Sequence, residues 1–424
     1  MNLVRNLLLV VSFAGLLAVN ATSARAQSAP PAGSSGKVEL ESEEALVRFA
    51  LSHNLELRAA RWDEDVAAAS VTGASALNNP RARAEWLHVQ SPANYGWGVG
   101  LEWAPPQPGV YGSGKDAARA QLRAVKADQS ERRADLEANV RGSYAQIAAL
   151  SEEIALAEKS VETRRAVNQA LTERVAHGAS SRIELSMVRI SLARGEQERD
   201  LLLLGRATEI TRLEALLGLP KGQSLSLTPH LTNEKAEAAP EPSALNRPQL
   251  QADAARADAA DATLAAERAK RYPWLALQAR YRKRDQSTYP DDVTLGVELV
   301  LPIFDQNPGP IAAAEASRRA QRDVLAAHRL EIERDVAVLR VESVRRREIA
   351  EHHAQTIAPL LVEHAALVKQ ALAGMELDLT ALLTAEDMVT HSGIEYLEAR
   401  LAQRRAEIAL ARALGEYGRV TGTK

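Results

Sequence analysis

The sequence predicts a mixed fold, in which long coiled-coil helices are joined to membrane β-strands in two tandem repeats. Three observations lead to this prediction. Residues 311–374 contain a single proline, Pro359, and are rich in the helix-forming residues Ala, Arg, Glu and Leu. Four short segments instead alternate apolar residues with polar residues or glycine, which is typical of strands. These features follow one another in the same order twice along the chain.

The repeat is visible as pairs of landmarks at nearly constant separation. The separation is 196 residues in the later part of each repeat and 193 residues in the earlier part. The pairs are Gly100 with Gly296, Glu102 with Glu298, Gly178 with Gly374, and, earlier, Leu57 with Leu250 and Pro80 with Pro273. Each repeat is expected to run helix, strand, strand, very long helix, turn, helix. The predicted repeats are residues 38–220 and 246–424, and the predicted linker between them is 221–245, which holds three prolines.

The helices expected from these patterns are unusually long. One covers residues 112–175 and the other 309–374, and the second would extend about 95 Å at 1.5 Å per residue. Apolar residues recur at spacings of three and four in both, which indicates coiled-coil packing. A kink is expected at Pro359. Residues 38–76 are expected to form one shorter helix ahead of the first strands.

The amino terminus has the pattern of a secretory signal over residues 1–26. Arg5 precedes an apolar core, and Ala24-Arg25-Ala26 forms a cleavage site. An uncleaved anchor is the alternative. Residues 27–37 read as a flexible leader, and the absence of cysteine excludes disulfides and thiolate metal sites. The net charge of −3 gives no indication of nucleic-acid binding.

The four predicted strands each have one apolar face and one polar or small face. They are expected at about 81–90, 95–104, 274–284 and 292–301. A small sheet packed on helices is one interpretation, and a membrane β-barrel, apolar outward and polar inward, is the other. Four strands cannot close a barrel, and lipid does not tolerate open sheet edges. The membrane interpretation therefore requires several chains to share one barrel.

At this point the sequence resembles the TolC-type outer membrane efflux proteins. The resemblance rests on EEALVRFALSHNLELRAAR near the amino terminus, the strand-to-helix junctions LEWAPPQPGVYGSGKDAARAQ and LVLPIFDQNPGPIAAAEASRRAQ, RYPWLALQARY, and the turn segments RVAHGASSRIELSMVRISLARGEQE and ALAGMELDLTALLTAEDMV. It covers nearly the whole chain after the signal. The resemblance implies a homotrimer in the Gram-negative outer membrane, with four strands per protomer in one 12-stranded β-barrel. It also implies a coiled-coil α-barrel tunnel that crosses the periplasm.

The PIFDQNPGPIAAAEA junction is similar to the heavy-metal, CzcC-like branch of the family. That similarity implies the outer membrane channel of a tripartite RND-type efflux system, which passively conducts divalent cations of cobalt, zinc, cadmium or nickel. The implied partners are a periplasmic adaptor and an inner-membrane transporter. The same type of channel could serve drugs, organic solutes or type I protein secretion. A secreted coiled-coil scaffold without a pore is the alternative from another class.

Signatures of catalysis are absent from the sequence. There is no Walker loop, no G-x-S-x-G, no H-E-x-x-H and no cysteine nucleophile, so we expect neither an enzyme nor a cofactor. Three histidines, His352, His353 and His364, lie close together on a long helix. Adjacent residues point apart there and the third lies three turns away, so solvated or packed histidines are expected instead of a metal site.

The two turns after the long helices are the predicted periplasmic tip, where the resemblance implies gating and adaptor docking. Gly178 and Gly374 suit the left-handed position after a helix, and Arg174 suits the helix dipole. Glu184 fits an acidic position of the family, and it also completes a capping box with Ser181, so the two interpretations coexist. The second turn has Thr380 at the matching position, with Asp378 as a nearby acidic residue, so the acidic constriction of some relatives is not carried over.

The apolar face of the strands is predicted to contact lipid. Its candidate residues are Tyr95, Trp97, Trp103, Leu275, Tyr281, Val297 and Leu299.

Overall fold

The computed structural model describes most of the chain after its first 36 residues. The described ranges are 37–40, 42–90, 93–220, 223–227, 229–231, 247–284, 291–374 and 379–417. The predicted signal segment and nearly all of the predicted leader lie outside these ranges, as do most residues of the predicted linker 221–245. Within the described residues, no helix combines the length and the apolar character needed to cross a lipid bilayer.

The first helical region is divided, whereas the sequence predicted one helix over 38–76. β1 (Lys37–Glu39) comes first, followed by α2 (Glu43–His53) and α3 (Leu55–Ala74). Asn54 separates the helices because its backbone is non-helical and its side chain caps α3. Its Oδ1 accepts from the amide of Leu57 at 2.9 Å, and its Nδ2 donates to the carbonyl of Leu216 at 2.9 Å. The helix break is therefore also an anchor to a distant part of the first repeat.

Four strands form one antiparallel sheet. They are β2 (Arg81–Gln90), β3 (Ala93–Trp103), β5 (Trp274–Arg284) and β6 (Asp292–Val300), in the order β2-β3-β5-β6. Each repeat contributes one hairpin, and the hairpins join where Val99 lies opposite Tyr281. In the described part of the chain, β2 and β6 are the outer strands and each has one neighbour. Both edges of the sheet are consequently open for pairing.

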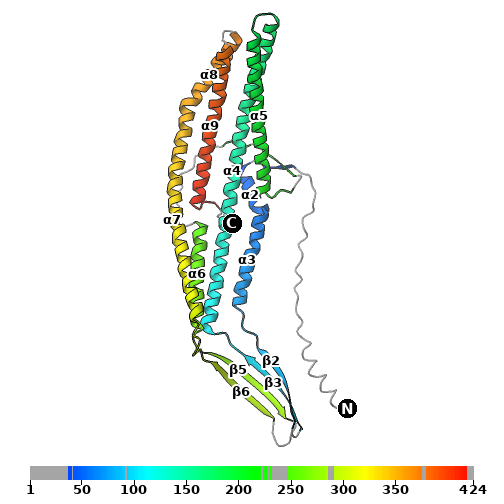
Figure 1. Ribbon diagram of the computed structural model, residues 1–424, viewed down its shortest axis with the longest axis vertical. Helices are drawn as coiled ribbons and strands as arrows, with labels where there is room; N and C mark the ends of the chain where they lie inside the picture. Colours follow the sequence, from blue (N-terminus) through cyan, green and yellow to red (C-terminus); the bar gives the residue numbers. More distant parts are fainter. Residues whose placement is uncertain are drawn as a thin grey trace, which may run out of the picture. The chain divides into compact units, whose positions relative to one another are not determined.

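The first long helix, α4 (Pro108–Ala176), has 69 residues and starts four residues earlier than predicted. Pro108 is tolerated because the first amides of a helix have no intrahelical partner. α4 packs against α2, α3, α6 (Pro248–Ala269), α9 (Leu379–Ala413) and α5 (Arg182–Leu216), as Figure 1 shows for its course beside α5 and α9. Its burial is correspondingly high, with Val140 and Ala148 fully buried and Ile147 only 1% exposed.

The second long helix is interrupted where the sequence placed a kink. α7 (Pro308–His352) passes into a five-residue π turn (His353–Ile357), and α8 (Ala358–Gly374) continues from it. Pro359 cannot donate to the carbonyl four residues earlier, and its ring crowds that carbonyl. In the π turn the amide of Ala358 donates to His353 instead, a bond across five residues. The wider turn thus relieves the conflict that Pro359 creates.

The segment between the repeats contributes a short strand, β4 (Ser224–Ser226), which pairs in parallel with β1. Leu225 of β4 joins the main core with apolar residues of α2, α3, α4 and α5. The buried members are Leu46, Val47, Ala50, Leu57, Leu136, Val140, Tyr144, Ile147, Leu213, Leu217 and Leu225. A second cluster joins α6, α7 and the end of α9 through Leu250, Ile332, Val336, Ala413 and Leu414.

Charged side chains also connect the two repeats. Arg141 of α4 contacts Glu43 and Glu44 of α2 at 2.9 and 2.8 Å, and Arg404 of α9 contacts Glu43 at 3.0 Å. Arg141, Glu43 and Arg404 are 12–16% exposed, so this network is largely desolvated. Removal of one member would leave an unpaired, buried charge, and the network therefore holds α2, α4 and α9 in one arrangement.

Candidate functional site

The two faces of the sheet are chemically distinct. Directly paired residues of antiparallel strands project from the same face, and one set of rows joins Val99 to Tyr281 and Leu277 to Val297. The next rows join Gly100 to Arg280 and Gln278 to Gly296. Alternation thus sorts most apolar side chains to one face and most charged side chains, with glycines, to the other; Lys283, opposite Trp97, is a charged residue on the apolar face.

The predicted lipid-contacting residues all occupy the apolar face by register. Val297, Leu299, Leu275 and Trp97 are 69, 55, 40 and 39% exposed in the single chain, so a large part of each side chain is left open to its surroundings. The Tyr281 ring meets the Trp97 ring edge-on at 5.7 Å. Trp103 lies at the helical end, where its indole N–H donates to the Asn78 carbonyl at 2.9 Å. The side chain of Tyr95 lies outside the described residues.

The other face carries both signs of charge. Its described polar or small members are Arg81, Arg83, Glu85, Gly98, Gly100, Glu102, Gln278, Arg280, Arg282, Asp292, Thr294, Gly296 and Glu298. Arg280 Nε lies 3.6 Å from Glu85 Oε1, and Gln278 donates to Glu298 at 2.7 Å. The first contact reaches from β5 across β3 to β2, and the second joins the neighbouring strands β5 and β6. Both belong to the polar lining expected of a water-filled lumen.

The turn after α4 has the geometry that the sequence predicted for Gly178. Its φ is +72°, and the amide of Ala179 donates to the carbonyl of Arg174 at 2.8 Å while that of Gly178 donates to Val175 at 3.1 Å. These two bonds form a Schellman motif. A Cβ on Gly178 would meet no atom within 4 Å, so backbone conformation, not crowding, is what favours glycine.

The next helix begins with the predicted capping box. The Ser181 amide donates to Glu184 Oε2 at 3.0 Å, and the Ser181 hydroxyl accepts from the amide of Ile183 at 3.1 Å. Glu184 therefore has a structural role at the start of α5.

The second turn is described only at its two ends. Gly374 is the last residue of α8, and α9 begins at Leu379, so the predicted acidic residue Asp378 lies outside the described residues. Thr380 is exposed in the first turn of α9, where its carbonyl accepts from the Thr384 hydroxyl at 2.8 Å. The helical assignment of Gly374 differs from the expectation that it follows the helix. The role predicted for Gly374 in the reversal stays a prediction.

The two helical hairpins pack together near these turns. Their shared cluster contains Val167 and Leu171 of α4, Leu185 and Val188 of α5, and Leu382 of α9. The chain therefore brings the two predicted tip regions into one packed unit, although they are separated by about 200 residues in the sequence.

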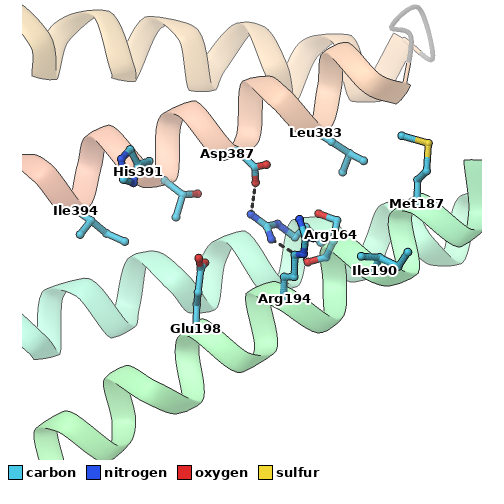
Figure 2. A pocket seen from close by; sticks show the side chains of 11 residues that line it. Arg164, Met187, Ile190, Arg194, Glu198, Leu383, Asp387, His391 and Ile394 are labelled. Carbon is cyan, nitrogen blue, oxygen red and sulfur yellow. Dashed lines mark hydrogen bonds and ion pairs between the residues drawn. The ribbon is translucent and has the colours of Figure 1, made fainter.

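Close to this cluster lies a groove that sequence reasoning missed (Figure 2). It has a volume of roughly 460 Å³ and is lined by α4, α5 and α9. Arg164 of α4 lies at its base with a side chain only 6% exposed, and its guanidinium donates to Asp387 Oδ1 at 2.5 Å and to the Ser191 carbonyl at 2.9 Å. One arginine thus links α4 both to α5 and to α9.

Next to the groove residue Asp387, a carboxyl group of α9 has a shifted pKa. Burial raises the pKa of Glu386, next to Asp387 on α9, while the positive charge of Arg164 opposes that rise. A sequence signal for this site existed. Arg164 falls between Val161 and Val167, at spacings of three, in the apolar seam of α4, and a charge at such a position requires a partner.

No group of three or more metal-ligating side chains is found in the described residues. His352 and His353 lie at the start of the π turn, where the sequence placed solvated or packed histidines.

Known proteins with similar sequences include an outer membrane export protein, in agreement with the two-faced sheet and long helices described above. A family model described as outer membrane efflux protein matches residues 46–219 and 240–416. The cobalt-zinc-cadmium resistance protein CzcC of Cupriavidus metallidurans is 27% identical over 54% of this chain and 55% of its own length. The pyoverdine export outer membrane protein OpmQ of Pseudomonas putida is 29% identical over 72% of this chain and 66% of its own. The matches thus span about half and about two thirds of the two relatives.

Among solved structures, the CmeC outer membrane channel of Campylobacter jejuni superposes with a TM-score of 0.76. The match covers 88% of this chain and 85% of that one at 16% identity, so the likeness is one of fold.

Proposed function

Because the chain belongs to the outer membrane efflux protein family, we propose that it is the outer membrane channel of a tripartite efflux system, and that three copies complete one barrel. The membership confirms the resemblance inferred from the motifs. The structural likeness confirms the fold class of helical tunnel and barrel. The family consists of channel proteins and not of enzymes, as the sequence predicted.

The observation that carries the proposal is the open, two-faced sheet. An apolar face with Val297 69% exposed requires an apolar environment, and the unpaired outer strands β2 and β6 require partner strands. Lipid and two further copies of the chain supply both. The polar face then lines a water-filled path, and the helices continue it as a tunnel through the periplasm.

Substitutions on the two faces test this arrangement. Val297→Lys places a charge on the lipid side and should destabilise the assembled protein by about 2–4 kcal/mol if it lies near the bilayer centre. Gly296→Lys is the matched control, because the neighbouring residue faces the polar side and a Cβ there meets only Gln278 Cβ at 3.9 Å. Trimer yield and outer membrane recovery should fall for the first variant only. Equal yields, or a wild-type protein that is a monodisperse monomer in mild detergent, would overturn the proposal.

For the cargo, we propose divalent heavy-metal cations. Support comes from the similarity to the CzcC protein, whose name records cobalt, zinc and cadmium resistance, and from the PIFDQNPGPIAAAEA junction. Deletion of the chain should raise sensitivity to these metals or to nickel. Unchanged metal tolerance together with altered sensitivity to dyes or detergents would contradict the cargo and leave the channel in place.

A second cargo is favoured by a specific observation. OpmQ, named for pyoverdine export, matches a longer part of the chain at similar identity. An organic anion is therefore the alternative substrate class. Export assays with a metal salt and with an organic chelator, in the same deletion strain, separate the two.

The tip residues are proposed to shape the entrance and the adaptor contact. Glu184 repeats around the axis of a trimer and would place negative charge there, while Glu184→Gln keeps the reach of the capping side chain without its charge. Reduced cation preference of Glu184→Gln trimers in planar bilayers supports an entrance role. Unchanged conductance and preference would leave only the capping role.

A further inference from the structure

We propose that the polar face of the sheet contains an anion-binding strip formed by Arg83 and Arg280 on either side of Gly100. The strip would bind carboxylate or phosphate groups of a solute in the barrel lumen. The inference rests on the proposed function, because it requires this face to line the lumen. Of the two proposed cargoes, it favours the organic anion over the metal cation.

The register brings the two arginines together. Arg83 lies opposite Gly100, Gly100 lies opposite Arg280, and Arg280 lies opposite Thr294. This row crosses all four strands without a carboxylate. At a strand separation of about 4.8 Å, the two arginine backbones are roughly 10 Å apart, with the glycine between them.

Packing of the strands does not explain why residue 100 is a glycine. A Cβ on Gly100 would lie 3.7 Å from the Ala279 carbonyl oxygen and 4.0 Å from that of Arg83, which are ordinary contacts. By contrast, a Cβ on Gly98 would meet Glu85 Cγ and the Tyr281 carbonyl oxygen at 3.3 Å, so strand packing explains that glycine. The missing side chain at Gly100 leaves space over β3 between the two arginine backbones, and the Arg280 side chain crosses β3 to reach Glu85 of β2.

The two arginines are weakly neutralised. Arg280 is paired with Glu85 at 3.6 Å, but both side chains are about 40% exposed, at 38 and 42%. An ion pair in such an exposed position contributes little and is easily exchanged. Arg83 is exposed and makes no ion pair with any residue that the structure describes. Two guanidinium groups on either side of a residue without a side chain suit bidentate binding of planar or tetrahedral oxyanions.

The adjacent row provides a matched control. Arg282 projects from the same face, but its row also holds Glu85 and Asp292, with Gly98 between Glu85 and Arg282. Removal of the Arg282 charge changes the net charge of the face as much as removal of the Arg83 charge does. Binding that depends on the geometry of the strip should therefore be lost with Arg83 or Arg280 and largely kept with Arg282.

The experiment uses purified full-length protein in planar bilayers at about 0.1 M salt, where charges are screened over about 10 Å. Citrate is added on the side of the barrel, and the concentration that halves the conductance is measured. For Arg83→Gln and for Arg280→Gln, each of which removes one charge as the control does, we expect that concentration to rise about tenfold, since a charge-assisted contact is lost. Arg282→Gln should change it less than about twofold.

Two further readings make the result decisive. Arg83→Lys with Arg280→Lys keeps the charges and should retain most of the citrate block, and hexamminecobalt(III), a cation of similar size, should not block at this strip. Wild-type channels that conduct but are not blocked by citrate, or equal loss of block in Arg282→Gln, would overturn the inference. A protein that forms no conducting pore would instead overturn the proposed function.

Discussion

The two long helices, one in each repeat, have similar sequence periodicity and very different surroundings. α4 is continuous and packs against five other helices, so that Val140 is fully buried and Ile147 nearly so. α7 is shorter, ends in a π turn, and leaves Val338, Val341 and Val344 more than half exposed. A heptad pattern therefore specifies that a helix has an apolar seam, but not that its own chain covers the seam.

The difference also indicates which surface of the protomer is left for another copy to cover. Exposed valines along one helix are costly in water, and a neighbouring copy in the proposed trimer would cover them. α4 is thus the internal axis of the protomer, and α7 is one of its lateral surfaces.

The largest expected effect separates these two roles. Ile147→Asp puts a charge into the main core, which should cost at least about 4 kcal/mol and abolish the folded protein. Val341→Asp, on exposed α7, should leave the helical circular dichroism signal intact while it lowers the trimer fraction in native mass measurements. If both variants unfolded, or if Val341→Asp assembled normally, the distinction between axis and lateral surface would be wrong.

A smaller effect is expected inside α4, where neighbouring arginines occupy opposite environments. Arg164→Met breaks the link to Asp387 and Ser191 and should lower the free energy of unfolding by about 1–3 kcal/mol. Arg165→Met is the control, because Arg165 pairs with Glu196 at 2.7 Å with both side chains at least 40% exposed. It should change stability by less than about 1 kcal/mol in urea titrations. Equal losses of stability in the two variants would show that the contacts of Arg164 with Asp387 and Ser191 add nothing beyond an exposed ion pair.

The two turns should respond unequally to the same substitution. Gly178→Val forces a β-branched residue to a φ of +72° and should cost about 1–2 kcal/mol. Gly374→Val replaces a residue at the helical end of α8 and should cost less, since valine accepts helical dihedrals better than left-handed ones. Thermal unfolding midpoints of the two variants compare them directly. A larger loss for Gly374→Val would instead support its predicted place in the reversal.

The smallest effect concerns pH, and it involves Glu386 of α9. The raised pKa of Glu386 means that the folded chain retains a proton that the unfolded chain has already lost. Stability should therefore fall as pH rises above the ordinary glutamate value of about 4.3. Glu386→Gln should remove this part of the slope. If the stability of Glu386→Gln changed with pH as that of the wild type does, protonation of Glu386 would not contribute to stability.

Much of the fold could be predicted from the sequence because its signals are periodic and repeated. Alternation identified the strands, and the separation of 196 residues identified the repeats. The division at Asn54 was missed because one polar residue inside a helical pattern is a weak signal, and only its bonds to Leu57 and Leu216 explain the break. Pro359 was located correctly, but a π turn requires knowledge of how the backbone accommodates the ring.

The candidate site was predictable where it depends on local bonds. Gly178, Ser181 and Glu184 interact within a few residues of one another, so spacing alone was informative. Arg164 and Asp387 are 223 residues apart, and nothing local reports their contact. The arginine strip depends on the register between the two hairpins, which no pattern within one strand determines.

The short parallel pair of β1 and β4 sets an order of events for the growing chain. Val38 lies opposite Leu225, so the first described strand cannot find its partner until nearly 190 further residues have been added. By then α2 to α5 are complete, and the whole second repeat is still to come. The closing of this pair therefore requires the chain from α2 to the end of α5 to be present, so the first strand ties the start of the first repeat to its end.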